Sequence, residues 1–137
     1  MDNEKLLKAL ENTNNSQLLT LTKSTIKKIK MDLLKELNID KNTILNYYDK
    51  LKDYRFVSEI NDMNNGSYMR WIEIGNPSVL NKGGIFCGIK ITDDGILITC
   101  KNFYHKHFQL KMDDYLIFQK INDQEAIILT ALEHLSK

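Results

Sequence analysis

The sequence predicts an α+β fold in which helices come first, a small antiparallel β-barrel follows and one helix ends the chain. Three observations support this order. Apolar residues recur at helical spacing up to about residue 53, alternate with polar residues between about residues 68 and 121, and return to helical spacing after residue 122. At 137 residues the chain suits a single domain. We divide it into a helical segment (residues 1–56), a barrel (57–121) and a C-terminal helix (122–137).

Three helices are expected before the barrel. Residues 3–12 form a short amphipathic pattern, and residues 17–38 form a longer one whose lysines fall largely outside the apolar stripe. Asp40 is placed to cap a third helix, which runs to about Asp53. Near the other end of the chain, Asn122 and Glu125 have the spacing of a capping box, which predicts where the last helix begins.

Five short strands are expected, because the apolar period changes to two. They cover residues 68–74, 85–92, 96–101, 108–112 and 115–121. Residues 75–78 are expected to form a loop, since Pro77 cannot donate a ladder hydrogen bond. Five short, strongly bent strands within about 55 residues favour a small SH3-like or OB-like barrel, which would cover its own strand edges.

The second and third strands are expected to form a hairpin whose core row can be predicted. A two-residue turn at Asp94-Gly95 would pair Ile91 with Ile98 and Ile89 with Cys100, so that apolar residues meet. The expected core row of the second strand is Ile85, Cys87, Ile89 and Ile91.

Composition excludes several classes of protein. The formal net charge is +1, so nucleic-acid affinity would have to come from a local patch and not from bulk charge. Two cysteines do not make a disulfide framework, which favours a reducing compartment. Neither a secretory signal nor a membrane-spanning segment is expected, because no long apolar run occurs.

No complete catalytic or cofactor motif occurs, so we expect neither enzyme activity nor a cofactor. Cys87, Cys100, His105 and His107 are zinc-ligand types, but no pair has the spacing of a zinc site, and two core thiols are the expected arrangement. The paired acids Asp93-Asp94 and Asp113-Asp114 fall in expected turns, where aspartate is favoured for backbone reasons.

The run from Lys101 to Phe108 is the first candidate site, because it combines aromatic and basic residues. Aromatic rings can stack on unpaired bases and lysines can contact phosphates, so the barrel would bind single-stranded nucleic acid or a protein. The alternative is a solvated loop in which Phe103 and Phe108 pack into the core. Trp71 is expected to fill the barrel, and Arg70 either pairs with Glu73 or Asp62 or serves a partner. The candidate contact residues are Arg70, Lys101, Tyr104, His105, Lys106 and His107.

A second hypothesis is a winged helix-turn-helix regulator over residues 31–74. An apolar helix, a turn and a capped second helix have the required order, and residues 56–74 could form the wing. Leu34 and Asn38 depart from the pattern, which prefers a small residue and glycine there. The residues that would read DNA are Lys41, Asn42, Asn46 and Lys50. A third hypothesis is a structural or packaging protein that forms homo-oligomers through its N-terminal helices.

Several segments together resemble a group of small, functionally uncharacterised proteins of giant (nucleocytoplasmic large) DNA viruses. The likeness covers roughly residues 50–135. It implies a viral protein inside the host cytoplasm or in the virion, and it implies no activity. The segments that carry it are Lys50–Val57, Gly66–Ile72, Asp94-Gly95, Cys100–Asn102, Phe108–Met112, Leu116–Lys120 and Asp123–Glu125.

Overall fold

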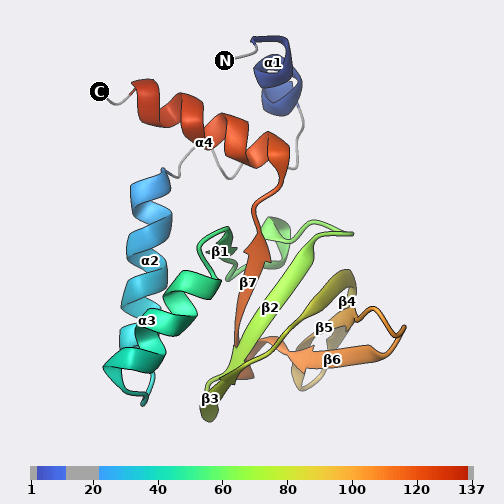
Figure 1. Ribbon diagram of the computed structural model, residues 1–137. Coiled ribbons are helices and arrows are strands. Elements are labelled where there is room, and N and C mark those ends of the chain that lie inside the picture. Colours follow the sequence, from blue (N-terminus) through green and yellow to red (C-terminus); the bar gives the residue numbers. More distant parts are fainter. Residues whose placement is uncertain (1–2, 12–21, 136–137) are drawn as a thin grey trace.

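The computed structural model describes residues 3–11 and 22–135, and within them it has four α-helices and an antiparallel sheet of seven strands (Figure 1). The α+β class predicted from the sequence is therefore confirmed. The helices are α1 (Asn3–Glu11), α2 (Lys23–Glu36), α3 (Lys41–Lys50) and α4 (Asp123–Leu135). The strands are β1 (Tyr54–Phe56), β2 (Tyr68–Glu73), β3 (Asn76–Leu80), β4 (Gly84–Thr92), β5 (Gly95–Lys101), β6 (His107–Lys111) and β7 (Tyr115–Lys120). Two short 3-10 helices, η2 (Ile60–Asp62) and η3 (Met112–Asp114), lie between strands.

The sheet does not close into a barrel, so the five-stranded SH3-like or OB-like barrel is not confirmed. The strand order is β1-β7-β2-β4-β5-β6, and β3 pairs with β2 outside this path. Strand β3 meets β2 at only two positions, with a register irregularity between them, and β6 pairs with β5 alone. A cavity of about 240 Å³ is lined mainly by residues of β2, β3 and β6.

Two strands escaped the sequence prediction for local reasons. Residues 76–80 form an edge strand although they include Pro77, whose carbonyl oxygen accepts a hydrogen bond from the Tyr47 hydroxyl at 2.9 Å. An edge position tolerates proline because one side of the strand needs no ladder partner. Strand β1 is only three residues long and pairs with β7, a partner far away in the sequence.

The β4–β5 hairpin has a register different from the expected one. Thr92 pairs with Gly95, so the turn is Asp93-Asp94, and Ile89 and Ile91 pair with Ile98 and Ile96. A bulge between Phe86 and Gly88 then reverses the alternation. As a result, Phe86 is buried opposite Cys100 while Cys87 is exposed. Ile89 and Ile91 are exposed as well and Ile85 is only partly buried, so the expected core row is wrong at Cys87, Ile89 and Ile91.

Buried residues lie on both faces of the sheet. One face carries Met69, Trp71 and Ile117, which confirms that Trp71 belongs to the core. On the opposite face, Ile72 and Phe118 pack against α2 and α3, and the ribbon shows these two helices along one side of β7 and β2 (Figure 1). A third cluster joins Ala9 of α1, Ile26 of α2, and Ile128 and Leu129 of α4.

The helix caps agree with the sequence. The Asp40 carboxylate accepts a hydrogen bond from Thr43 N at 2.7 Å and begins α3. The capping box of α4 is reciprocal, since Glu125 N donates to Asn122 Oδ1 at 2.8 Å and Asn122 N donates to Glu125 Oε1 at 3.1 Å. The longer expected helix begins later, at Lys23, with Thr22 as its cap, and residues 17–21 lie outside the described residues.

A buried ion pair fastens α4 to the sheet. Arg55 Nε donates to Glu125 Oε2 at 3.0 Å, and Arg55 Nη2 lies 2.9 Å from the same oxygen. Both side chains are buried, and Arg55 Nη2 also donates to the carbonyl oxygen of Asp62. The pair therefore fixes the start of α4 against β1. Across the described residues, no helix combines the length and apolar character that crossing a membrane requires.

Candidate nucleic-acid interface

The connection between β5 and β6 is a tight loop organised by Asn102. Its side-chain oxygen accepts hydrogen bonds from Tyr104 N at 2.9 Å and Lys106 N at 3.0 Å. The main chain of Asn102 also accepts from His105 N and donates to the carbonyl oxygen of Lys106. His105 has a φ of 62°, a left-handed conformation that is uncommon for a residue other than glycine. These bonds hold the loop in one shape.

The loop directs its aromatic side chains into solvent. Phe103 is 80% exposed and Tyr104 is 90% exposed. The expectation that Phe103 packs into the core is therefore wrong, whereas Phe108 is partly buried and meets Trp71 edge to face, with ring centroids 5.9 Å apart. Phe103 instead stacks on Tyr68, with centroids 6.2 Å apart and planes inclined by 30°.

Strand register brings three of the predicted residues, Arg70, Lys101 and His107, onto one face of the sheet. Tyr68 pairs with Ile85, Ile85 with Lys101, and Lys101 with His107, so the four lie in one row across β2, β4, β5 and β6. Arg70 follows Tyr68 by two residues on β2 and therefore faces the same side. We call the residues of this row and of the adjoining loop the basic-aromatic surface: Tyr68, Arg70, Lys101, Phe103, Tyr104, His105, Lys106 and His107.

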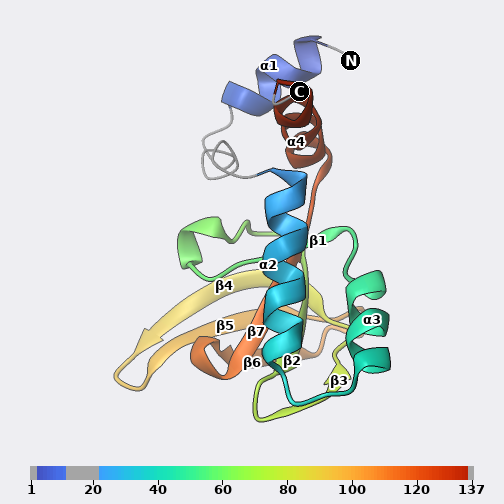
Figure 2. The same ribbon diagram turned by 90° about the vertical axis from the view of Figure 1, so that its left-hand side faces the viewer.

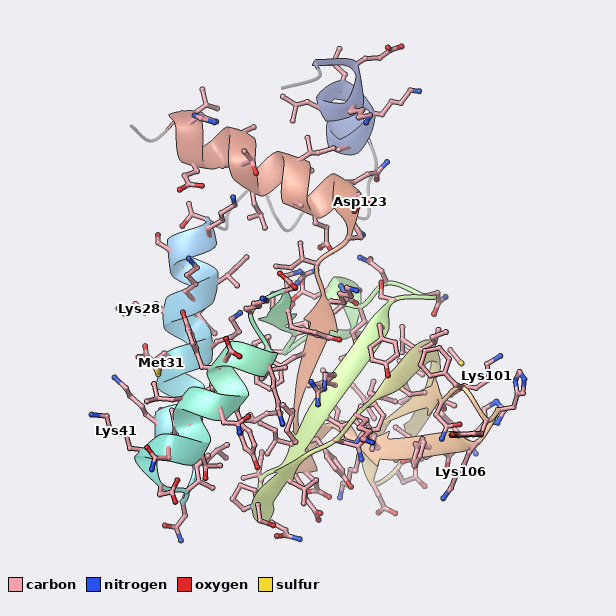
Figure 3. The ribbon with its side chains drawn as sticks, in the orientation of Figure 1. Lys28, Met31, Lys41, Lys101, Lys106 and Asp123 are labelled. Atoms are coloured by element: carbon pink, nitrogen blue, oxygen red, sulfur yellow. The ribbon has the colours of Figure 1, made fainter. Side chains whose placement is uncertain are left out.

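This end of the molecule has no nearby carboxylate in its own segments. Between residues 63 and 112, which include β2, β4, β5 and β6, the acids are Glu73, Asp93 and Asp94. Glu73 lies at the far end of β2, and the two aspartates lie in the far turn between β4 and β5. Lys101 and Lys106 lie at the end of the sheet farthest from the helices (Figure 3). The local charge is therefore positive although the whole chain is nearly neutral.

Two basic side chains of this surface have defined contacts. Arg70 is half-buried, and its Nε donates to the carbonyl oxygen of Asn81 at 3.0 Å, so the pairing considered with Glu73 or Asp62 does not describe its contact. The Lys106 ammonium lies 5.3 Å from the centroid of the Phe108 ring, within cation–π range. The Arg70 contact is thus with a main-chain oxygen, and the ring beside Lys106 is Phe108, which packs against Trp71.

Sequence reasoning missed Tyr68 as a part of this surface and Asn102 as the residue that holds its loop. The hydroxyl of Tyr68 donates to the carbonyl oxygen of Lys82 at 2.8 Å, which holds its ring beneath Phe103. The alternation of Tyr68 and Arg70 on one strand was a signal that could have revealed the shared face. The residue type of Asn102 was a signal, since asparagine side chains in turns commonly bond to the backbone two residues further on, as Asn102 does with Tyr104 N.

The alternative DNA-reading residues lie on a different part of the molecule. Lys41, Asn42, Asn46 and Lys50 are all exposed on α3, together with the acid Asp49. The expected wing is not formed by residues 56–74, because β1 pairs with β7 and only β2 follows in that segment. DNA reading by α3 stays a prediction: its four candidate residues are exposed, but the expected wing is not present in residues 56–74.

The two cysteines have different environments. Cys100 is buried, and desolvation raises the pKa of its thiol to about 12, with a smaller contribution from the neighbouring Cys87. Cys87 is exposed at the bulge. Among residues 3–11 and 22–135, no group of three or more histidine, cysteine, aspartate or glutamate side chains gathers as a metal site would require. Within this described part of the chain, Cys87, Cys100, His105 and His107 therefore do not come together as one set of ligands.

The chain matches no protein-family model, no curated protein and no solved structure.

Proposed function

We propose that this protein is a non-enzymatic binding module that holds single-stranded nucleic acid on its basic-aromatic surface. The observation that carries the proposal is the exposure of Phe103 and Tyr104 in a loop held by Asn102, beside lysines and within residues 95–112, which contain no acid. An exposed aromatic side chain loses favourable burial, so a rigid loop with two of them favours a binding role.

The chemistry fits unpaired bases better than a duplex. A base can stack on Tyr104 or on the Phe103–Tyr68 pair, and each such stack contributes about 1–3 kcal/mol in single-strand binding proteins. Arg70, Lys101 and Lys106 can contact the phosphates that follow. With three phosphate contacts, the logarithm of the affinity should fall with the logarithm of salt concentration with a slope of about −2.

The test is fluorescence anisotropy with labelled single-stranded DNA and RNA across a salt series. Tyr104→Ala should weaken binding about tenfold or more, because one stacked base is lost while the loop keeps its main-chain bonds. Lys106→Gln should reduce the salt slope by about 0.7. Lys28→Gln is the matched control, since Lys28 is exposed on α2 at the other side of the molecule (Figure 3).

Two results would contradict the proposal. One is absence of single-strand binding at low salt by a folded protein, which would favour a protein partner for this surface. The other is binding of duplex DNA alone, lost with Lys41→Ala and Asn42→Ala and kept with Tyr104→Ala, which would favour the helix-turn-helix hypothesis. Viral origin and assembly through the N-terminal helices stay predictions, and the proposed function does not depend on them.

A further inference from the structure

A second cationic site lies between the helices and the end of β7, and none of its lining residues belongs to the basic-aromatic surface. It is a cavity of about 310 Å³ between α2, the end of β7 and α4, closed on one side by the residues that follow α3. In Figure 1, β7 leads into one end of α4 and α2 begins below the other end, and Figure 2 shows α2 in line with the segment that joins β7 to α4. Five lysines line this cavity: Lys23, Lys27, Lys30, Lys52 and Lys120.

Lysines reach the cavity from three separate segments. Lys23, Lys27 and Lys30 follow one another at four- and three-residue spacing on α2, which places them on the same side of the helix. Lys52 comes just after α3, and Lys120 ends β7. Lysines on one solvated helix face would need no partner. Here lysines from three segments line the same cavity, so their positive charges lie close to one another.

Carboxylates do not balance these charges. Asp53 is the acid among the lining residues, and the Lys23 ammonium lies 3.4 Å from Glu133 in an exposed pair at the rim. Lys30 is 1% exposed, and its Nζ donates to the carbonyl oxygen of Leu51 at 2.7 Å. Burial lowers its pKa to about 8, opposed by Asp53 and assisted by Lys27. The cavity therefore holds an excess of cationic groups that an anion would relieve.

The rest of the lining is apolar. Ile26 and Leu129 are buried members of the helical cluster and form part of the wall, together with Ile121 and Ala126. The volume is at the lower end of the range for small-molecule sites, which combine an apolar wall with a few placed polar groups. An inorganic ion would use the lysines and leave this wall unfilled.

We propose that this cavity binds a small organic phosphate, with the phosphate between Lys27 and Lys120 and an apolar or aromatic body against Ile26 and Leu129. A phosphate dianion suits the site because ammonium groups bind phosphate as point charges and can approach it from several directions. This site is separate from the proposed nucleic-acid surface.

The experiment is a calorimetric titration with 1-naphthyl phosphate, compared with 1-naphthol and with inorganic phosphate. The first should bind saturably, and each of the other two at least tenfold more weakly, since each lacks one half of the recognition. Lys27→Gln and Lys120→Gln should each weaken binding of 1-naphthyl phosphate about tenfold. Lys28→Gln is the matched control on the same helix, because Lys28 is exposed and does not line the cavity.

Three outcomes would overturn the proposal. These are absence of saturable binding at millimolar 1-naphthyl phosphate, equal affinity for 1-naphthol, and an equal loss with Lys28→Gln. Thermal unfolding of each variant checks that the fold is intact. Tyr104→Ala should leave 1-naphthyl phosphate binding unchanged, and Lys27→Gln should leave oligonucleotide binding unchanged, so the two proposals can fail separately.

Discussion

Replacing Lys30 with methionine should stabilise the protein at neutral pH. The Lys30 ammonium is buried, and desolvation lowers its pKa from 10.5 to about 8, with Lys27 and Asp53 acting in opposite directions. That difference corresponds to about 3 kcal/mol, because each pKa unit is worth 1.36 kcal/mol. Methionine has similar length and flexibility and carries no charge, so Lys30→Met removes the penalty while still filling the space between the helices.

The hydrogen bonds lost in Lys30→Met reduce the gain without reversing it. The carbonyl oxygen of Leu51 also accepts from Tyr54 N at 2.9 Å, so the variant leaves no orphaned acceptor there. A typical hydrogen bond contributes about 1 kcal/mol net. We therefore expect Lys30→Met to raise the free energy of unfolding by about 2 kcal/mol at pH 7.

The pH dependence gives a second, independent readout. Below pH 8 Lys30 is charged in both the folded and the unfolded state, and the penalty is fully present. Between pH 8 and 10.5 the unfolded chain binds more protons, so the contribution of Lys30 to stability rises with pH. The stability advantage of the Lys30→Met variant over the wild type should therefore shrink between pH 8 and 10.5.

Urea unfolding from pH 6.5 to pH 10.5 measures both effects, with Lys28→Met as the control for an exposed lysine of the same helix. Other groups titrate in this range, but they cancel in the difference between wild type and variant. If Lys30→Met is less stable at pH 7, or if the difference does not change with pH, the ammonium is not held at a cost and the reasoning is wrong.

Two further predictions follow from buried groups. Glu125→Gln keeps the side-chain acceptor of the capping box and removes the charge opposite Arg55, so the free energy of unfolding should fall by about 3 kcal/mol in denaturant titrations. Alkylation with iodoacetamide should modify Cys87 in the folded protein and reach Cys100 only after unfolding, since Cys100 is buried with a pKa of about 12, and equal rates would contradict the structure.

Local chemistry made much of the fold predictable. The Asp40 cap and the Asn122–Glu125 capping box depend on residues three apart, and both are present as expected. Most strands were found because alternation is a property of a single segment. Strand β1 was missed because three residues show little alternation and its pairing with β7 lies far away in sequence.

The hairpin register shows why pairing was harder to predict. The expected and observed registers of β4 and β5 differ by two residues, and a shift of two keeps every side chain on its original face. Apolar residues therefore meet in both registers, and the pattern cannot choose between them. The bulge places Phe86 in the core and exposes Cys87. Which of these two neighbours is buried depends on packing across the sheet, which the sequence of one strand does not contain.

The cationic sites were predictable to different degrees for the same reason. The run from Lys101 to His107 is contiguous, so its residues could be named, but the exposure of Phe103 depends on Tyr68 of another strand. The lysines of this helix were expected to fall largely outside the apolar stripe, yet Lys30 lies four residues after Ile26 and four before Leu34, in the buried row of α2. A charged residue that interrupts an apolar row must be buried with a partner, and for Lys30 the protein itself supplies two carbonyl oxygens and Asp53. The position of that lysine in the apolar row was therefore the sequence signal that Lys30 is buried and bonded within the protein.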